Sequence, residues 1–294
     1  MPRTRWSFWR CSIRTAKLDG LNPESKDYKS KPIVAAVSYL NTVPLVWGAL
    51  RGAQRSDMRV EFHLPSLCAD LVREKKADIG ILPVIEIARQ GLEIFPGACI
   101  ASDGPVRSIL LISKVPLGQV RTLACDRGSR TSVMLARIIL REMHGSVPLL
   151  LPPSAPELET MLQSADAALI IGDPALAIEP EDLPYFWVDL GEQWRNLTQL
   201  PMVFAAWAGA GQWITPRLEK AFTASLEYGM ANLEMIVAEQ SKERGFAQNL
   251  IREYLTTNIV FNLGPREFEG MRTFLNYAGE LEPNLSPLAE RTSI

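Results

Sequence analysis

Four short runs of small and branched apolar residues constrain the fold of this chain more than any other feature. They are PIVAAVSYL (32–40), ADIGILPV (77–84), DAALIIGD (166–173) and PMVFAAWAG (201–209). Short apolar runs with little polar alternation are typical of strands that are buried on both faces. Segments with helix capping signals lie between several of these runs. The sequence therefore predicts an α/β fold with a largely parallel sheet.

Two α/β units follow one another along the chain. The first hundred residues read as strand–helix–strand–helix–strand, and a second alternation of strands and helices follows. Between the two units, residues 97–114 form a long extended segment that is interrupted by Asp-Gly-Pro. Residues 201–209 then form another buried strand after the second unit is complete. We therefore expect a second lobe inserted into the first through two extended crossovers, with residues 32–112 and 203–294 in lobe 1 and residues 113–202 in lobe 2.

Local signals place the expected helices. Pro44 opens a helix that Gly52 closes, Ser66 is expected to cap a helix at 65–76, and Gly145 closes a helix at 130–144. Further helices are expected at 155–165, 214–241, about 243–255 and 264–280.

A cleft between the lobes is the expected ligand site, as in other folds where the carboxyl ends of strands face a crevice.

The first 31 residues form a basic leader that differs from the rest of the chain. Residues 1–32 carry eight Lys or Arg and three acidic residues, a net charge of +5, whereas the formal net charge of the whole chain is −2. The leader has neither the apolar region of about 7–15 residues of a secretory signal nor a periodic pattern. We expect a disordered tail or a start codon placed too far upstream, with a surface-binding arm as the alternative.

Composition and motifs exclude several classes of function. The near-neutral net charge argues against nucleic acid as the main partner, and no apolar run approaches the roughly 18 residues of a membrane span. Since no secretory signal is visible either, the sequence favours a cytoplasmic protein, and it leaves the oligomeric state open. Phosphate-loop, dinucleotide, zinc-protease and nucleophile-elbow motifs are all absent. No metal site or cofactor is predicted, because no zinc spacing or ligand cluster is formed by Cys11, Cys68, Cys99, Cys125, His63 and His144.

Polar side chains gather instead where predicted strands pass into helices or crossovers. If the two lobes face each other, these junctions converge on one cleft, and helix N-termini there favour anions. Most of the side chains are neutral donors, and few could act as bases. Structural roles remain open for some of them: Ser66 and Asp173 could cap helices, Arg107 could form an ion pair, and Asn41 could satisfy a turn. The candidates are Ser38, Tyr39, Asn41, Thr42, Ser66, Ser102, Asp103, Arg107, Ser108, Ser129, Arg130, Thr131, Ser132, Asp173 and Thr198.

Four of these segments together resemble a known family. They are VSYLNTVPL, IASDGPVRSILLISK, DRGSRTSVMLARIIL and ALIIGDPAL, and the similarity extends from about residue 33 to 207. The combination is similar to the MqnA family of menaquinone biosynthesis, the chorismate dehydratases of the futalosine pathway. This resemblance implies a type II periplasmic-binding-protein-like fold, used without export. It also implies conversion of chorismate to 3-[(1-carboxyvinyl)oxy]benzoate and water, without a metal or organic cofactor.

The resemblance also assigns roles to residues. Asn41 and Ser108 are the expected catalytic residues, with Ser102 as the second choice of serine, and the other polar candidates are expected to bind the two carboxylates of chorismate. The enolpyruvyl carboxylate of the substrate is the expected base, and Asp173 is the alternative base. One residue departs from the family pattern: Gln199 stands where the family is expected to have glycine, which puts the role of Thr198 in doubt.

Two other functions stay open at this stage. A non-catalytic solute-binding protein of the same fold would bind a small aromatic or carboxylate ligand, and it would be expected to carry an export signal. An enzyme of the same fold that acts on another precursor is the third possibility, because fold alone does not define a reaction.

Overall fold

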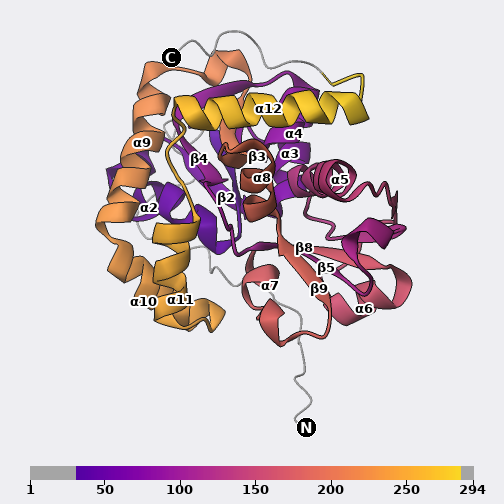
Figure 1. Ribbon diagram of the computed structural model, residues 1–294. Helices are drawn as coiled ribbons and strands as arrows, with labels where there is room; N and C mark the ends of the chain where they lie inside the picture. The colour runs from indigo at the N-terminus through magenta and orange to yellow at the C-terminus, as the bar shows by residue number, and fades with distance from the viewer. Residues whose placement is uncertain (1–30, 286–294) are drawn as a thin grey trace. The chain divides into compact units, whose positions relative to one another are not determined.

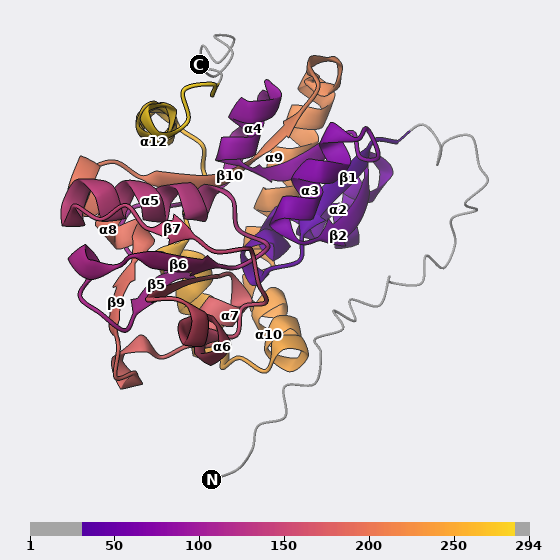
Figure 2. The ribbon, with the colours of Figure 1, turned by 90° about the vertical axis from the view of Figure 1, so that its right-hand side faces the viewer.

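The computed structural model describes residues 31–285, shown in two views (Figures 1 and 2). Apart from Lys31, the basic leader predicted from the sequence lies outside the described residues. Residues 32–285 belong to one compact unit. None of the helices within residues 31–285 combines the length and the apolar composition that a membrane span requires.

The first of two five-stranded sheets combines parallel and antiparallel strands. Its strand order is β2-β1-β3-β10-β4. β1 pairs in parallel with β2 and β3, whereas β10 is antiparallel to both β3 and β4. The predicted parallel sheet is therefore confirmed for the first three strands, and the sheet is antiparallel at its other edge. The strands are β1 (Ile33–Val37), β2 (Arg59–His63), β3 (Ile79–Pro83), β4 (Glu93–Ser102) and β10 (Met202–Gly209).

The second sheet has the same arrangement, in the order β7-β6-β8-β5-β9. β6 is parallel to β7 and β8, and β5 is antiparallel to β8 and β9. Both β5 and β10 are the first strands that the chain forms after it leaves the other sheet. The strands are β5 (Ile109–Ser113), β6 (Thr122–Cys125), β7 (Leu149–Leu150), β8 (Ala167–Ile171) and β9 (Phe186–Asp189).

This topology confirms the two-lobe α/β fold with one lobe inserted into the other. The chain crosses from β4 to β5 through residues 103–108, and it returns from α8 to β10 through residues 199–201. The lobe boundaries given above, at residues 112/113 and 202/203, stay predictions.

Eleven helices accompany the sheets within residues 31–285. Figure 1 shows α9, α10 and α11 beside the first sheet, and α6 and α7 near the second. α12 contacts β10 and α4 as well as α5, so it touches elements on both sides of the crossovers. The helices are α2 (Val43–Arg51), α3 (Pro65–Arg73), α4 (Val84–Gln90), α5 (Thr131–His144), α6 (Leu158–Ser164), α7 (Asp173–Leu176), α8 (Leu190–Thr198), α9 (Pro216–Ala231), α10 (Leu233–Arg244), α11 (Gln248–Glu253) and α12 (Pro265–Leu281).

Some helix predictions were wrong in detail. The single helix expected at 214–241 is broken at Asn232, whose φ of −111° and ψ of 26° leave the helical region. α4 and α8 were not predicted. Ser66 does not cap α3: the N-cap is Leu64, Pro65 stands at the first helical position, and no side chain closes this helix start.

Aromatic packing fixes the helices to the sheets. The Trp207 ring of β10 stacks on the Phe222 ring of α9 at a centroid distance of 4.5 Å. Phe95 of β4 packs edge-on against the Phe222 ring at 5.0 Å. On the other side of the crossovers, Trp194 of α8 packs edge-on against Phe274 of α12 at 6.1 Å. Both tryptophans are fully buried, so each anchors one helix through a large apolar area.

Two glycines of α12 give a test of this packing. A Cβ atom on Gly270 would lie 2.0 Å from the carbonyl oxygen of Pro201 in the return crossover, whereas a Cβ on Gly279 meets nothing within 4 Å. We expect Gly270→Ala to lower the free energy of unfolding by about 1–3 kcal/mol, because α12 must move off the crossover. Gly279→Ala should raise it by about 0.5–1 kcal/mol through helix propensity. Urea unfolding measures both changes, and shifts of the same sign would contradict this account of the α12 contact.

Candidate active site

Three polar side chains from distant parts of the chain meet in one buried cluster. Asn41 lies in η1 (Leu40–Thr42), the short 3₁₀ turn after β1, and Ser108 lies at the end of the first crossover. Tyr254 begins the π-helical turn η6 (Tyr254–Asn258) after α11. Its hydroxyl oxygen lies 3.1 Å from Asn41 Nδ2 and 2.8 Å from Ser108 Oγ. Asn41 is 9% exposed, and Ser108 and Tyr254 are each 1% exposed.

Backbone contacts hold the first two residues of this cluster. The carbonyl oxygen of Ser108 accepts a hydrogen bond from Gly172 N (2.8 Å), which ties the crossover to the end of β8. The backbone N–H of Thr42 closes η1 onto the Tyr39 carbonyl oxygen (3.1 Å), and α2 follows directly, with Pro44 in its first turn. The sequence predicted Asn41 and Ser108 as separate candidates. In the structure, both lie within hydrogen-bond distance of the Tyr254 hydroxyl.

Asp173 connects this region to the C-terminal helices. Its Oδ1 accepts a hydrogen bond from Leu40 N at 2.9 Å, and its Oδ2 forms an ion pair with Arg244 of α10. Arg244 also donates to the Ser38 carbonyl oxygen at 3.1 Å. Burial raises the pKa of Asp173, while the Arg244 charge acts in the opposite direction. Both carboxylate oxygens are therefore engaged, and together with Arg244 they fix the backbone on either side of Tyr39.

Tyr39 packs tightly against the end of β8. A Cβ atom on Gly172, whose φ is 66°, would lie 2.4 Å from the Tyr39 ring, so only glycine fits this position. The Tyr39 hydroxyl lies beside Gly128, close to Asp126. Burial raises the pKa of Tyr39, and the nearby carboxylates of Asp126 and Asp173 raise it further.

The segment that opens α5 offers hydrogen-bond donors. Ser129 Oγ is buried and has no hydrogen-bond partner among the described residues. The N-cap of α5 is Arg130, and no side chain caps the helix start. Ser132 is buried in the first turn, and Thr131 Oγ1 accepts a long hydrogen bond of 3.4 Å from Ile85 N. The first turn of α5 therefore keeps the partial positive charge of a helix N-terminus.

Arg130 itself is engaged by two carboxylates. Its guanidinium lies 2.9 Å from Asp70 Oδ1 of α3 and 2.9 Å from Glu86 Oε2 of α4. Glu86 is buried, which raises its pKa, but the hydrogen bond from Arg89 and the Arg130 charge bring that pKa below its ordinary value. Arg130 thus joins α5 to the helices of the first sheet.

Several other candidates lie in structural contacts. Arg107 has a positive φ of 65°, donates to the Ile178 carbonyl oxygen at 2.7 Å and pairs with Glu179 at 2.8 Å. The exposed Asp103 binds Arg195 at 3.0 Å and Arg266 at 3.1 Å. The ion pair considered for Arg107 is therefore present.

Four more of the polar candidates, all within the described residues, form no hydrogen bond with the Tyr254 hydroxyl. Ser102 Oγ is buried beside Gly191 of α8, and Thr42 Oγ1 lies 3.5 Å from Asn41 Oδ1. Ser66 lies in the first turn of α3. Thr198 Oγ1 donates to the Trp194 carbonyl oxygen at 2.9 Å and accepts from Leu200 N at 3.2 Å, so it closes the end of α8.

Gln199 has a backbone conformation that suits glycine, the residue expected at this position from the family resemblance. It is the C-cap of α8, with φ of 62° and ψ of 17°, a left-handed conformation that glycine adopts without strain. The side chain is exposed, and it contacts the Asn196 carbonyl oxygen at 3.4 Å.

Sequence reasoning missed Tyr254, Arg244 and two buried carboxylates. No motif marks Tyr254 or Arg244, which lie in helices without a distinctive pattern. Asp126 had a visible signal, since an acid stands at the end of a predicted strand and is the first residue of the DRGS turn. Asp189 caps α8 and also accepts hydrogen bonds from the backbone of Val106 and Arg107 at 3.0 and 2.6 Å.

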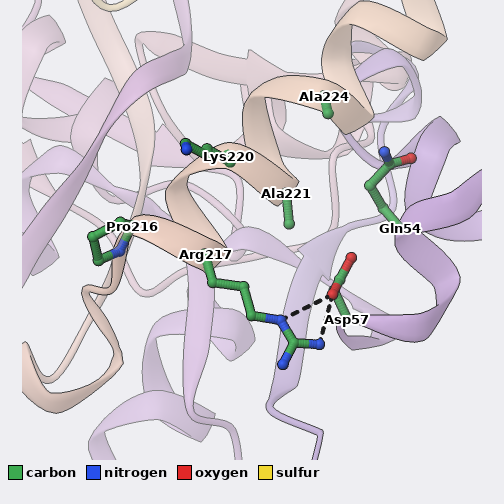
Figure 3. Close-up of a pocket in the computed structure, with 7 residues that line it drawn as sticks. All are labelled: Gln54, Asp57, Pro216, Arg217, Lys220, Ala221 and Ala224. Atoms are coloured by element: carbon green, nitrogen blue, oxygen red, sulfur yellow. Dashed lines mark hydrogen bonds and ion pairs between the residues drawn. The ribbon is translucent and has the colours of Figure 1, made fainter.

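Two surface pockets lie away from this cluster. One, of about 540 Å³, is shown in Figure 3 and lies between α9 and the η2 turn (Ala53–Ser56). Arg217 and Asp57 form an ion pair of 2.9 Å at its edge. Among the described residues, no group of three or more His, Cys, Asp or Glu could hold a metal ion.

Comparisons with solved structures define the class of fold. The chain is similar to a protein of Archaeoglobus fulgidus, with a TM-score of 0.66 and 13% identity over 86% of this chain and 98% of that one. It is also similar to the periplasmic aliphatic sulphonate binding protein of Escherichia coli, with a TM-score of 0.58 and 14% identity over 90% and 95% of the two chains. The fold is therefore that of the periplasmic binding proteins.

The sequence comparison narrows this class to a family. A family model described as menaquinone biosynthesis matches residues 32–280, so the chain belongs to this family. A protein named chorismate dehydratase from Thermus thermophilus is 26% identical over 207 residues, which cover 65% of this chain and 75% of that protein.

The buried carboxyl of Asp126 predicts a pH-dependent stability. Burial raises its pKa from 3.8 to about 6, although the backbone N–H groups of Gly128 and Ile171 favour the charged form. The protonated carboxyl therefore stabilises the fold below about pH 4, and this contribution is lost as the pH rises through about 6. At each pH, the free energy of unfolding of the natural protein is subtracted from that of Asp126→Asn. We expect this difference to increase by about 1–3 kcal/mol between pH 4 and pH 7, because the natural protein loses stability as the carboxyl ionises.

Urea unfolding at several pH values measures this difference. The exposed Glu181→Gln is the matched control and should show no comparable trend. A difference between Asp126→Asn and the natural protein that stays constant with pH would contradict the assignment.

Proposed function

We propose that the protein is a lyase that removes water from chorismate to give 3-[(1-carboxyvinyl)oxy]benzoate in menaquinone biosynthesis, without a metal or organic cofactor. The observation that carries the proposal is the meeting of Asn41 and Ser108 on one buried phenol, at 3.1 and 2.8 Å. Family membership and the relative named chorismate dehydratase support it. We place the reaction in the cytoplasm, with a free small molecule as the substrate.

The chemistry needs one base and a set of donors. A ring C–H bond breaks, its electron pair forms the new double bond, and the neighbouring C–O bond breaks with its pair on the departing hydroxyl oxygen. Asn41 and Ser108 are neutral, so they are suited to donate hydrogen bonds rather than to remove the proton. We propose that the enolpyruvyl carboxylate of the substrate takes the proton, which finally completes the water molecule.

Asp173 is less suited to act as the base than the substrate carboxylate. Its two oxygens are engaged by Leu40 N and by Arg244, and either contact would weaken on protonation. The arrangement favours a role in which Asp173 holds η1, and with it Asn41, in place.

The first turn of α5 is the proposed site for a substrate carboxylate. It combines an uncapped helix N-terminus with the unpartnered hydroxyl of Ser129 and the buried hydroxyl of Ser132. Arg130 shields this site from the acidic side chains of Asp70 and Glu86, because it pairs with both.

Asn41→Ala tests the catalytic assignment. Loss of one preorganised donor to a developing charge lowers kcat by about 100-fold or more, whereas KM should change only a few-fold. Steady-state kinetics with chorismate give both values, and the exposed Asn196→Ala serves as the control. A rise in KM at unchanged kcat would show that Asn41 only binds the substrate.

The proposed reaction is tested with purified protein and chorismate in the presence of a chelator. Mass spectrometry should detect the enolpyruvyl benzoate, and calorimetry measures binding of chorismate separately. Binding without product would instead favour a solute-binding protein of the same fold. A product that forms only after a metal is added would contradict the cofactor-free mechanism.

A further inference from the structure

We propose that Tyr254 is a positioning residue of this site, whose phenol orients the Ser108 hydroxyl as a hydrogen-bond donor toward the substrate. The inference rests on the proposed function and extends it to the C-terminal helices, which none of the sequence motifs reaches. It follows from counting the donors and acceptors that meet at the Tyr254 oxygen.

The hydrogen bond from Asn41 to the phenol determines the direction of the hydrogen bond between the phenol and Ser108. Asn41 Nδ2 has hydrogens but no lone pair, so at 3.1 Å it can only donate to Tyr254 Oη. The amide oxygen of Asn41 is engaged elsewhere, 3.5 Å from Thr42 Oγ1. The phenol hydrogen therefore needs another acceptor, because a buried donor without a partner is costly.

Ser108 Oγ supplies that acceptor. It lies 2.8 Å from Tyr254 Oη, a normal length for a hydrogen bond between two hydroxyls. With the phenol hydrogen directed at Ser108, the serine hydrogen is free to point elsewhere. In the proposed reaction it donates to the departing hydroxyl group and stabilises the charge that develops there.

Tyr254 keeps its own proton in this arrangement. Burial raises its pKa above the ordinary value of a tyrosine, and Ser108 and Asn41 offset this only in part. The phenol therefore stays protonated and keeps a hydrogen to donate to Ser108. The water that leaves is completed by the ring proton that the substrate carboxylate has accepted.

The backbone around Tyr254 holds the phenol in place. Tyr254 begins a π-helical turn, a wide turn that is rare and is often found at functional sites. The turn ends at once in two backbone hydrogen bonds, of 2.9 and 2.8 Å, between Val260 and Ala101 of β4. The π-helical turn is thus anchored to the strand that leads into the first crossover.

Tyr254→Phe tests the inference, because it keeps the ring and removes only the hydroxyl. We expect kcat for chorismate to fall by about 10–100-fold, with the Kd of chorismate within about threefold of the natural value. Tyr277→Phe is the matched control: Tyr277 packs its ring on Trp194 at 6.0 Å, lies outside the site, and should leave kcat unchanged.

A double variant separates positioning from general stabilisation. If Tyr254 acts through Ser108, Ser108→Ala alone and Ser108→Ala combined with Tyr254→Phe should have the same kcat. If the double variant instead loses kcat by the product of the two single factors, the two residues act independently and the inference is overturned. An unchanged kcat in Tyr254→Phe would also overturn it, as would a loss of activity that follows a lower melting temperature and a weaker Kd.

The same assays distinguish this inference from the proposed function. If the natural protein binds chorismate but forms no product, the proposed function fails, and the inference fails with it. If the natural protein forms the product and Tyr254→Phe forms it equally fast, only the inference fails.

Discussion

One buried carboxylate, Asp189, holds together the part of the structure on which the site depends. Its oxygens accept hydrogen bonds from Val106 and Arg107 in the first crossover and from Gly191 and Glu192 at the start of α8. Burial raises its pKa, and the four backbone N–H groups oppose this by stabilising the charge. The residue that follows Arg107 is Ser108, so the position of the proposed catalytic hydroxyl depends on this contact.

Most of the fold could be predicted from the sequence because buried strands leave a strong signal. The apolar runs at 32–40, 77–84, 166–173 and 201–209 all became strands of the two sheets. The antiparallel placement of β10 left no signal, because a strand that is buried on both faces has the same composition in either direction. The short helix α4 was also missed, since it follows β3 without an intervening turn.

Only part of the candidate site could be predicted. Asn41 and Ser108 stand in segments with a family resemblance, and the structure brings them together. Tyr254 was invisible, because it depends on a π-helical turn and on a tertiary contact across more than a hundred residues. Arg130 shows the opposite case: the residue type suggested an anion ligand, but acidic partners on α3 and α4 already engage it.

The ion pairs of Arg130 have a consequence for anion binding. They link α5 to acidic residues on α3 and α4, so any separation of α5 from these helices breaks two ion pairs. Such a separation would free the Arg130 guanidinium, and the return of α5 would restore both pairs. The freed guanidinium would attract an anion, whereas Asp70 and Glu86 neutralise its charge while the pairs are formed. The attraction of anions to this region would therefore depend on the distance between α5 and the helices α3 and α4.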